Sequence, residues 1–330
     1  MKTLALTLCA SLVAVPAAAE SFRMQTFLGA NASTTKAFEA MAEGLRETTD
    51  GRVDITVLPG RAVVGAGETI EAIENGILDG QYTAPSYFAG KDPAMGVLGD
   101  TLAAYPDSAT RDGWFDNGGL ELARELYAGY GLHLICAVYW PPEQIPSKVE
   151  ISGVGDLEGL KMRAPGGLAS DLLNRAGASL VNLGVGESVT AMETGTLDAT
   201  DLANVALNVA LGMHNQAKYS VLARHSMAVT EMSVREDKWS GLSAEDQAAF
   251  QDACNAMSDE LKGTLSDEDA AAVTEAKDNL GVTFIAFGED DAATFRTMTK
   301  AVWDDWGSRS EMAGRIVESH KAYLAELGLD

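Results

Sequence analysis

The sequence is poor in positive charge and in histidine. It contains 24 Lys and Arg residues against 48 Asp and Glu residues, so its formal net charge is −24. Because a phosphate backbone is bound through Lys and Arg, this balance excludes nucleic acid as a partner. The four histidines are scattered and no C-x-x-C pair accompanies them, so the sequence contains no zinc-site pattern.

Long apolar runs are also missing. No segment reaches the roughly 18 apolar residues that indicate a membrane-spanning helix. The nearest is Leu4–Val15, which follows Lys2 and precedes the small-residue site Ala17-Ala18-Ala19. This order is typical of a cleaved secretory signal. We therefore expect residues 1–19 to be a signal peptide, and the mature chain to begin near Glu20 and not to be embedded in a membrane.

Cysteine is nearly absent from the mature chain. Cys9 lies in the predicted signal, which leaves Cys136 and Cys254. The two could pair in an oxidising compartment. Each lies in an apolar or helical pattern, however, where cysteine is usually a small buried hydrophobe. The sequence leaves the pairing open and favours two free thiols.

Enzyme motifs are missing as well. No G-x-S-x-G, H-E-x-x-H, P-loop or G-x-G-x-x-G stands at a strand-to-helix turn. The acidic run Glu289-Asp290-Asp291 is more typical of a solvated turn than of a catalytic pair. We expect no enzymatic activity and no cofactor. The alternative from another class is a secreted hydrolase that uses two carboxylates.

Strands and helices alternate in what remains. Phe22–Phe27 has the pattern of a strand, 34–48 places apolar residues at helical spacing, and 52–58 alternates as a second strand. Such alternation predicts an α/β fold with largely parallel sheets and helices on both faces.

An internal repeat divides the chain in two. Gly67–Asp79 recurs as Gly186–Asp198 with seven of thirteen positions identical, and Phe22–Gln25 resembles Leu160–Arg163 upstream. The repeat predicts two related lobes, with these two strands at equivalent places in different sheets. Ligands of such lobes bind at the carboxyl ends of strands. We therefore expect a ligand cleft between the lobes, with Gln25 on one side and Arg163 and Asp201 on the other.

Arg163 is the leading candidate for ligand binding. It ends a strand and precedes Pro165-Gly166-Gly167 and a helical segment. Glycines let backbone approach a ligand, and a guanidinium matches a carboxylate with two parallel hydrogen bonds. An ordinary salt-bridged surface arginine is the alternative.

The segment Asp156-Leu157-Glu158-Gly159-Leu160-Lys161-Met162-Arg163 resembles the "D-L-x-G-L-K-x-R" motif of TRAP-transporter substrate-binding proteins of the DctP family. Gly195-x-Leu197-Asp198-Ala199 is similar to that family's next hallmark. The resemblance implies a two-lobed periplasmic binding protein fold of type II-like form. It also implies a receptor in the periplasm that captures a small organic acid through Arg163 by hinge closure and hands it to membrane permease subunits. A receptor for an ABC importer or a sensor kinase is the alternative within the same fold.

The resemblance also implies an organisation. Lobe I would comprise 20–141 and about 228–268, lobe II 142–227 and about 269–310, and 311–330 would form a C-terminal helix. A long helix over Ser243–Asn279 would bridge the lobes.

Further site residues follow from the same resemblance. In members that bind 2-oxo acids a metal lies beside the ligand; its ligand positions resemble Gln144, Asp201-Leu202 and a place near His225. A histidine there argues against a hard cation, so we expect no metal. Other site residues are expected from their positions in the sequence. Asn204 follows a predicted strand and could donate to the ligand or cap the next helix. The aromatic residues expected around the cleft are Phe27, Tyr82, Tyr87 and Trp140, which precedes Pro141-Pro142 at the expected lobe crossing.

Overall fold

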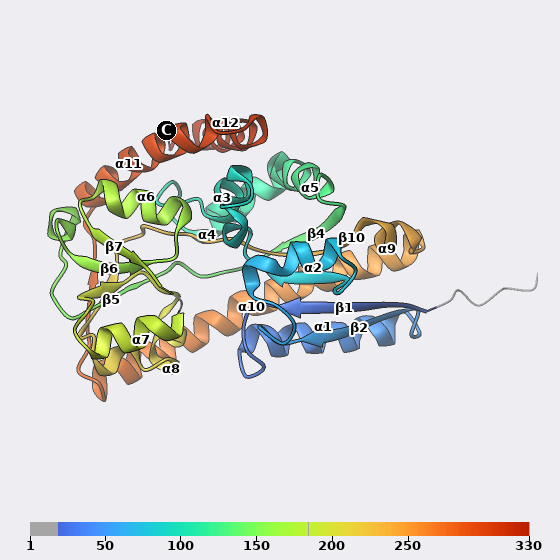
Figure 1. The fold of residues 1–330 in the computed structure, drawn as a ribbon, viewed down its shortest axis with the longest axis horizontal. Helices are drawn as coiled ribbons and strands as arrows, with labels where there is room; N and C mark the ends of the chain where they lie inside the picture. The colour runs from blue at the N-terminus through green and yellow to red at the C-terminus, as the bar shows by residue number, and fades with distance from the viewer. Residues whose placement is uncertain (1–18, 184, 330) are drawn as a thin grey trace, which may run out of the picture.

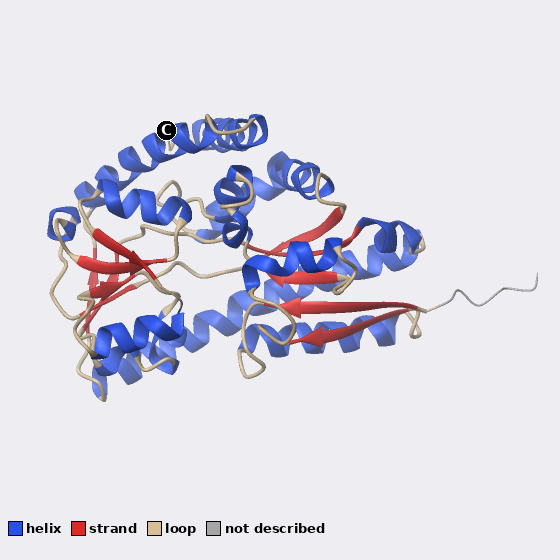
Figure 2. Cartoon of the chain, in the orientation of Figure 1, coloured by secondary structure: helices blue, strands red, loops and turns tan. Residues whose placement is uncertain are grey.

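The computed structural model describes residues 19–183 and 185–329; the predicted signal, except Ala19, lies outside the described residues. Its strands form two separate sheets, which Figure 2 shows as two groups of arrows with helices around each. The prediction of a two-lobed α/β protein is confirmed. None of the helices in the described part of the chain has the length and apolar character needed to cross a bilayer.

The first sheet has five strands in the order β2-β1-β3-β10-β4. β1 runs parallel to β2 and β3, whereas β10 is antiparallel to β3 and β4. The strands are β1 (Glu20–Thr26), β2 (Val53–Leu58), β3 (Gly80–Thr83), β4 (Leu132–Val138) and β10 (Thr230–Arg235).

The second sheet has six strands in the order β11-β9-β5-β8-β6-β7. β6 runs parallel to β7 and β8, and β5 is antiparallel to β8 and β9. The strands are β5 (Ile145–Ser147), β6 (Lys161–Ala164), β7 (Ser179–Asn182), β8 (Ala199–Thr200), β9 (Tyr219–Leu222) and β11 (Thr283–Ala286).

The repeat seen in the sequence is a structural repeat. The parallel orders β2-β1-β3 and β7-β6-β8 correspond, and β1 and β6 occupy the same central place in different sheets. The hydrogen bonds match too. The backbone N–H of Arg23 donates to the carboxylate of Asp79 at 2.9 Å, and that of Lys161 donates to Asp198 at 3.3 Å. The prediction that Phe22–Phe27 and Leu160–Arg163 lie at equivalent places is confirmed.

Helices cover both sheets and connect them (Figure 1). α10 is the longest, with 35 residues, and spans about 50 Å at 1.5 Å per residue. It contacts α1 and β4 in the first lobe and α8 in the second. The bridging helix predicted over Ser243–Asn279 is therefore present. The helices are α1 (Ser33–Thr48), α2 (Thr69–Glu74), α3 (Pro93–Gly99), α4 (Ser108–Trp114), α5 (Leu120–Ala128), α6 (Gly167–Arg175), α7 (Val185–Glu193), α8 (Val205–Ala210), α9 (Glu236–Gly241), α10 (Ala244–Asp278), α11 (Glu289–Gly307) and α12 (Glu311–Glu326).

The two C-terminal helices lie over both lobes. α11 packs against α6 of the second lobe and against α3, and α12 packs against α3 and α11. His320 of α12 is buried between Trp114 and Trp303, stacked 3.9 Å from the first ring, and its Nδ1 lies 2.8 Å from the Tyr105 hydroxyl. These contacts fasten the end of the chain to the body of the protein.

Cys136 and Cys254 form a disulfide, so the expectation of two free thiols is wrong. Cys136 lies on β4 and Cys254 on α10, and both are buried in the core of the first lobe. The local patterns around each cysteine were interpreted correctly as buried. They did not show that β4 and α10 pack face to face and bring the two Cα atoms within 6.2 Å.

Candidate functional site

A cavity of about 370 Å³ lies between the two lobes. Phe27, Ser86 and Tyr87 line it from the first lobe, and Arg163 and the start of α6 line it from the second. Another part of its wall comes from the segments that cross between the sheets. These are 139–144, which joins β4 to β5, and 223–229, which joins β9 to β10. The cavity therefore lies at the carboxyl ends of β1 and β6, the position expected for a ligand site.

Arg163 is the penultimate residue of β6, and its side chain lies in this wall with only 7% exposed. Its Nε donates to the Leu183 carbonyl at 2.9 Å and its Nη1 to the Asp201 carbonyl at 2.6 Å. Both partners are uncharged backbone groups. Within 19–183 and 185–329 no carboxylate lies at ion-pair distance from the guanidinium, and those of Asp201 and Glu143 interact with its charge only from farther away. The alternative of a salt-bridged surface arginine does not describe this residue.

The start of α6 adds to the attraction for an anion. Gly166 and Gly167 have φ angles of 96° and 64°, a region that favours glycine, and both line the cavity with Leu168 and Ala169. The first N–H groups of a helix have no partners within the helix and carry partial positive charge. Arg163 and this helix start together favour a carboxylate.

Gln25 occupies in the first lobe the place of Arg163 in the second. Its Nε2 donates to the Val64 carbonyl at 2.9 Å, and its Oε1 accepts from the N–H groups of Val63 and Val64. Val64 and Leu183 are equivalent in the repeat, so both side chains hold the loop that precedes the repeated helix. Gln25 is fully buried and does not line the cavity.

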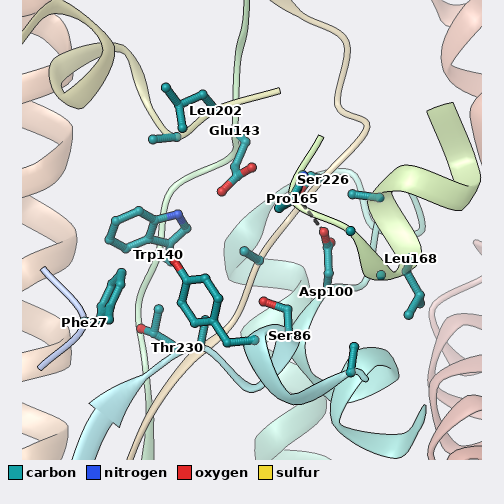
Figure 3. Close-up of a pocket in the computed structure, with 18 of the residues that line it drawn as sticks. Phe27, Ser86, Asp100, Trp140, Glu143, Pro165, Leu168, Leu202, Ser226 and Thr230 are labelled. Carbon is teal, nitrogen blue, oxygen red and sulfur yellow. Dashed lines mark hydrogen bonds between the residues drawn. The ribbon is translucent and has the colours of Figure 1, made fainter. Parts of the chain in front are cut away.

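Two carboxyl groups also line the cavity, Asp100 and Glu143. Asp100 accepts hydrogen bonds from Ser226 Oγ at 2.7 Å and from the N–H groups of Leu102 and Met227. Burial raises its pKa to about 6 despite these bonds. Asp100 thus fastens the end of α3 to the crossing segment 223–229. Glu143 points into the cavity between Trp140 and the Asp100–Ser226 pair (Figure 3).

Behind the wall, Asp201 and His225 form a buried pair with 2.8 Å between Oδ1 and Nε2. Burial alone would raise the pKa of Asp201, but His225 and Arg163 outweigh it and lower that pKa. Gln144 lies beside them because its backbone bridges to Leu202. The structure therefore brings together the positions that resemble metal ligands. They suit a hard cation poorly, because the single carboxylate among them already contacts an imidazole.

Aromatic rings form another part of the wall. Phe27 lies 5.5 Å from Trp140 and 6.4 Å from Tyr87, measured between ring centroids, and all three line the cavity. Tyr82 lies 5.6 Å from Phe27 on the side away from the cavity and is fully buried. Tyr82 thus supports Phe27 from behind.

Of the ten residues proposed from the sequence, four line the cavity: Phe27, Tyr87, Trp140 and Arg163. The side chain of Asn204 neither caps α8 nor reaches the cavity lining, because its amide donates to Asp269 of α10 at 2.7 Å. Gln25, Tyr82, Gln144, Asp201 and His225 lie next to the lining rather than in it. Glu143, Asp100 and Ser86 were not proposed. Glu143 stands between Trp140 and Gln144 in the sequence, and this position, not its residue type, is the signal that could have identified it.

The chain matches the model of bacterial extracellular solute-binding protein family 7, DctP, over residues 24–309. It belongs to this family. A curated relative, the monocarboxylate 2-oxoacid-binding periplasmic protein of a Nostoc species, is 23% identical over 92% of this chain and 81% of its own length.

Solved structures of TRAP periplasmic solute-binding proteins share the fold. One from Rhodobacter sphaeroides, in an open form without ligand, is 33% identical with a TM-score of 0.80, over 94% of this chain and 99% of that one. Another, from Xanthobacter autotrophicus with bound galacturonate, is 20% identical with a TM-score of 0.79, over 91% and 99%. The cavity of this family 7 protein therefore lies in a fold whose members are solute receptors.

Proposed function

We propose that this family 7 protein is a periplasmic receptor that binds a small organic acid in the cavity between its lobes and delivers it to a TRAP-type membrane permease. The observation that carries the proposal is Arg163. Its charge faces the cavity at the start of α6 without an acidic partner in the described chain. An unpaired guanidinium in a largely buried wall is costly unless a ligand anion completes it.

The relatives support the same ligand class. One is named for 2-oxo acids and another was solved with galacturonate, and both ligands carry a carboxylate. Export through the predicted signal would bring the receptor to the compartment where a permease takes up its substrate. The receptor has no catalytic role in this proposal.

Closure of the lobes over the ligand belongs to the proposal. The cavity wall is shared between both lobes and two crossing segments, so a ligand bound to one lobe gains contacts when the other approaches. Hinges of this kind are a few loop residues that absorb changes in φ and ψ.

A thermal-shift screen of organic acids on the mature protein tests the function. A ligand at about 100 times its Kd should raise the free energy of unfolding by roughly 2.7 kcal/mol. Failure of every carboxylate in a broad screen, with uncharged solutes binding instead, would contradict the proposal. Copurification with TRAP permease subunits, as opposed to ABC importer subunits or a sensor kinase, tests the partner.

A further inference from the structure

A second ionisable group besides Arg163 lines the cavity, the carboxyl group of Glu143. Glu143 faces the cavity and forms no ion pair with any residue of the described chain. Its backbone N–H donates to the Ser226 carbonyl at 3.3 Å, which fixes the place from which the side chain extends. A site made only for an anion has no use for a carboxylate in its wall, because like charges repel at short range.

The neighbours of Glu143 make an ionised carboxylate there unfavourable when the cavity holds only water. Burial raises its pKa well above the usual range, the charges of Asp201 and Asp100 and a side-chain contact with Asp201 raise it further, and the charge of Arg163 lowers it. Of these groups, Asp100 is held by Ser226 and Asp201 by His225. A positive charge on the ligand would therefore stabilise the ionised form of Glu143 more than that of the other two carboxyl groups.

Aromatic rings line the cavity near Glu143. Trp140 lies three residues before Glu143 on the crossing segment, and Phe27 packs against it with an angle of 63° between the ring planes (Figure 3). Tyr87 continues this wall and is 47% exposed. Aromatic faces around a carboxylate are the arrangement that proteins use to hold organic ammonium groups.

The remaining wall offers few free hydrogen-bonding groups. Ser226 donates to Asp100, and Thr230 donates to the Val138 carbonyl at 2.9 Å, so these two of the lining hydroxyls already form hydrogen bonds. In the part of the chain that is described, Ser86 and Tyr87 are the lining hydroxyls without a hydrogen bond. A ligand with many hydroxyl groups would lose more hydrogen bonds to water than this wall replaces.

We propose that the ligand is a zwitterion whose carboxylate binds Arg163 and whose compact ammonium group lies between Glu143 and the rings of Trp140 and Phe27. This inference rests on the proposed function and names its ligand class. An apolar ligand body between the two charges would fill the space lined by Leu202, Leu207 and Leu168.

Pairs of probes with one shape and different charge test the inference. Trimethylammonioacetate and trimethylammoniobutyrate are compared by titration calorimetry with tert-butylacetate and tert-butylbutyrate, in which carbon replaces the charged nitrogen. Galacturonate serves as the polyhydroxylated acid. At least one ammonium probe should bind about tenfold or more tightly than its carbon counterpart and than galacturonate.

The variants separate the two charges. Glu143→Gln should weaken binding of the ammonium probe by about 30-fold or more. Binding of the tert-butyl acids should stay unchanged or become slightly tighter. Glu193→Gln, at an exposed position on α7, is the matched control and should change neither. Arg163→Gln should weaken both kinds of probe.

The results also distinguish failure of this inference from failure of the proposed function on which it rests. Tert-butyl acids or galacturonate that bind as tightly as the ammonium probes, with Arg163 still required, would overturn the zwitterion and leave the organic-acid receptor standing. The same holds if no ammonium probe binds while another acid from the screen does. Loss of all carboxylate binding, or binding that ignores Arg163, would instead refute the proposed function.

Discussion

Different atoms of the Arg163 guanidinium have different roles. Its Nε and Nη1 hold backbone carbonyls, as Gln25 does in the other lobe, and the rest of the guanidinium faces the cavity. Because of the two carbonyl bonds, removing the side chain also removes support from the loop before α7.

The first prediction uses this difference. Arg163→Ala should weaken binding of the carboxylate found by screening by roughly 30-fold to several thousand-fold, because truncating one partner of a buried pair costs about 2–5 kcal/mol. It should also lower the free energy of unfolding by about 1–3 kcal/mol, since two buried carbonyls lose their donors. Arg163→Gln should weaken binding similarly but retain more stability, because a glutamine makes the equivalent bond in lobe I. Calorimetry and denaturant unfolding measure the two effects. An Arg163→Ala protein that binds within threefold of wild type would refute the ligand role.

Glu231 gives a prediction about pH. It lies buried on β10, where it accepts a hydrogen bond from Gln81 at 2.7 Å, and burial raises its pKa to about 8. The folded protein thus keeps this carboxyl protonated at pH 7, while in the unfolded chain it ionises with a pKa of about 4.3. Its contribution to stability is therefore complete below about pH 4 and is lost as pH rises towards 8.

Glu231→Gln should remove that loss, because an amide resembles the protonated acid. The variant should gain stability relative to wild type between pH 5 and 8, by an amount on the order of a few kcal/mol. Denaturant unfolding at several pH values measures it, with the exposed Glu260→Gln on α10 as the control. A difference between variant and wild type that stays constant across this range would contradict the buried, protonated glutamate.

Sequence reasoning at this scale succeeded where a residue's own type limits its role. An arginine at a strand end before glycines, and aromatic residues near a lobe crossing, were placed in the cavity correctly. It did not identify Glu143 or Asp100 as lining residues, because an acid in a chain with 48 acids carries no distinguishing signal. It also could not tell Tyr82 in the layer behind from Phe27 in the lining, since both lie at the ends of adjacent strands and only packing separates them.

At the scale of elements, the internal repeat predicted most of the fold. Residues 67–79 and 186–198 predicted equivalent helix and strand pairs, and the structure places Gly76 and Gly195 at equivalent helix ends with φ angles of 70° and 77°. Contacts between distant elements were not predictable in the same way. The packing of β4 on α10 joins residues 118 apart in the sequence, and no local pattern encodes that separation.

The disulfide gives a prediction for these two elements. A cross-link that closes a loop of this length restricts the unfolded chain, which the chain-entropy relation values at about 4–5 kcal/mol. The double variant Cys136→Ala/Cys254→Ala should lose stability of that order or somewhat less, and should still bind ligand, because the bond lies in the core of lobe I. Denaturant unfolding with and without a reductant measures the loss. The reductant should destabilise wild type and leave the double variant unchanged; a wild-type midpoint that does not move on full reduction would contradict the expectation.

At the scale of the whole molecule, three kinds of connection limit how the lobes can move. Two crossing segments, 139–144 and 223–229, are joined to each other through Glu143 and Ser226 and line the cavity. α10 is fastened to both lobes, by the disulfide at one end and by Asp269, which accepts from Asn204 and from the Ala206 N–H, at the other. α11 and α12 lie over both lobes on another side (Figure 1). These connections favour a bending motion of limited extent over a sliding one.

The last prediction follows from that arrangement. Val63 and Val181 are exposed by 37% and 42%, and each belongs to the strand-end region that Gln25 or Arg163 holds in its lobe. Spin labels on Val63→Cys and Val181→Cys report the distance between these two strand-end regions, one in each lobe. The ligand contributes bonds from one lobe to the other only when the lobes approach, and approach removes water that competes with the Arg163 contact. Addition of the carboxylate found by screening should therefore shorten and narrow the distance distribution.

Labels on Val63→Cys and Ile77→Cys, both in lobe I, should show no change. The same ligand added to the labelled Arg163→Gln variant should shorten the distance only at concentrations raised in proportion to its weaker Kd. A distance between the lobes that is identical with and without saturating ligand would show that binding occurs without closure.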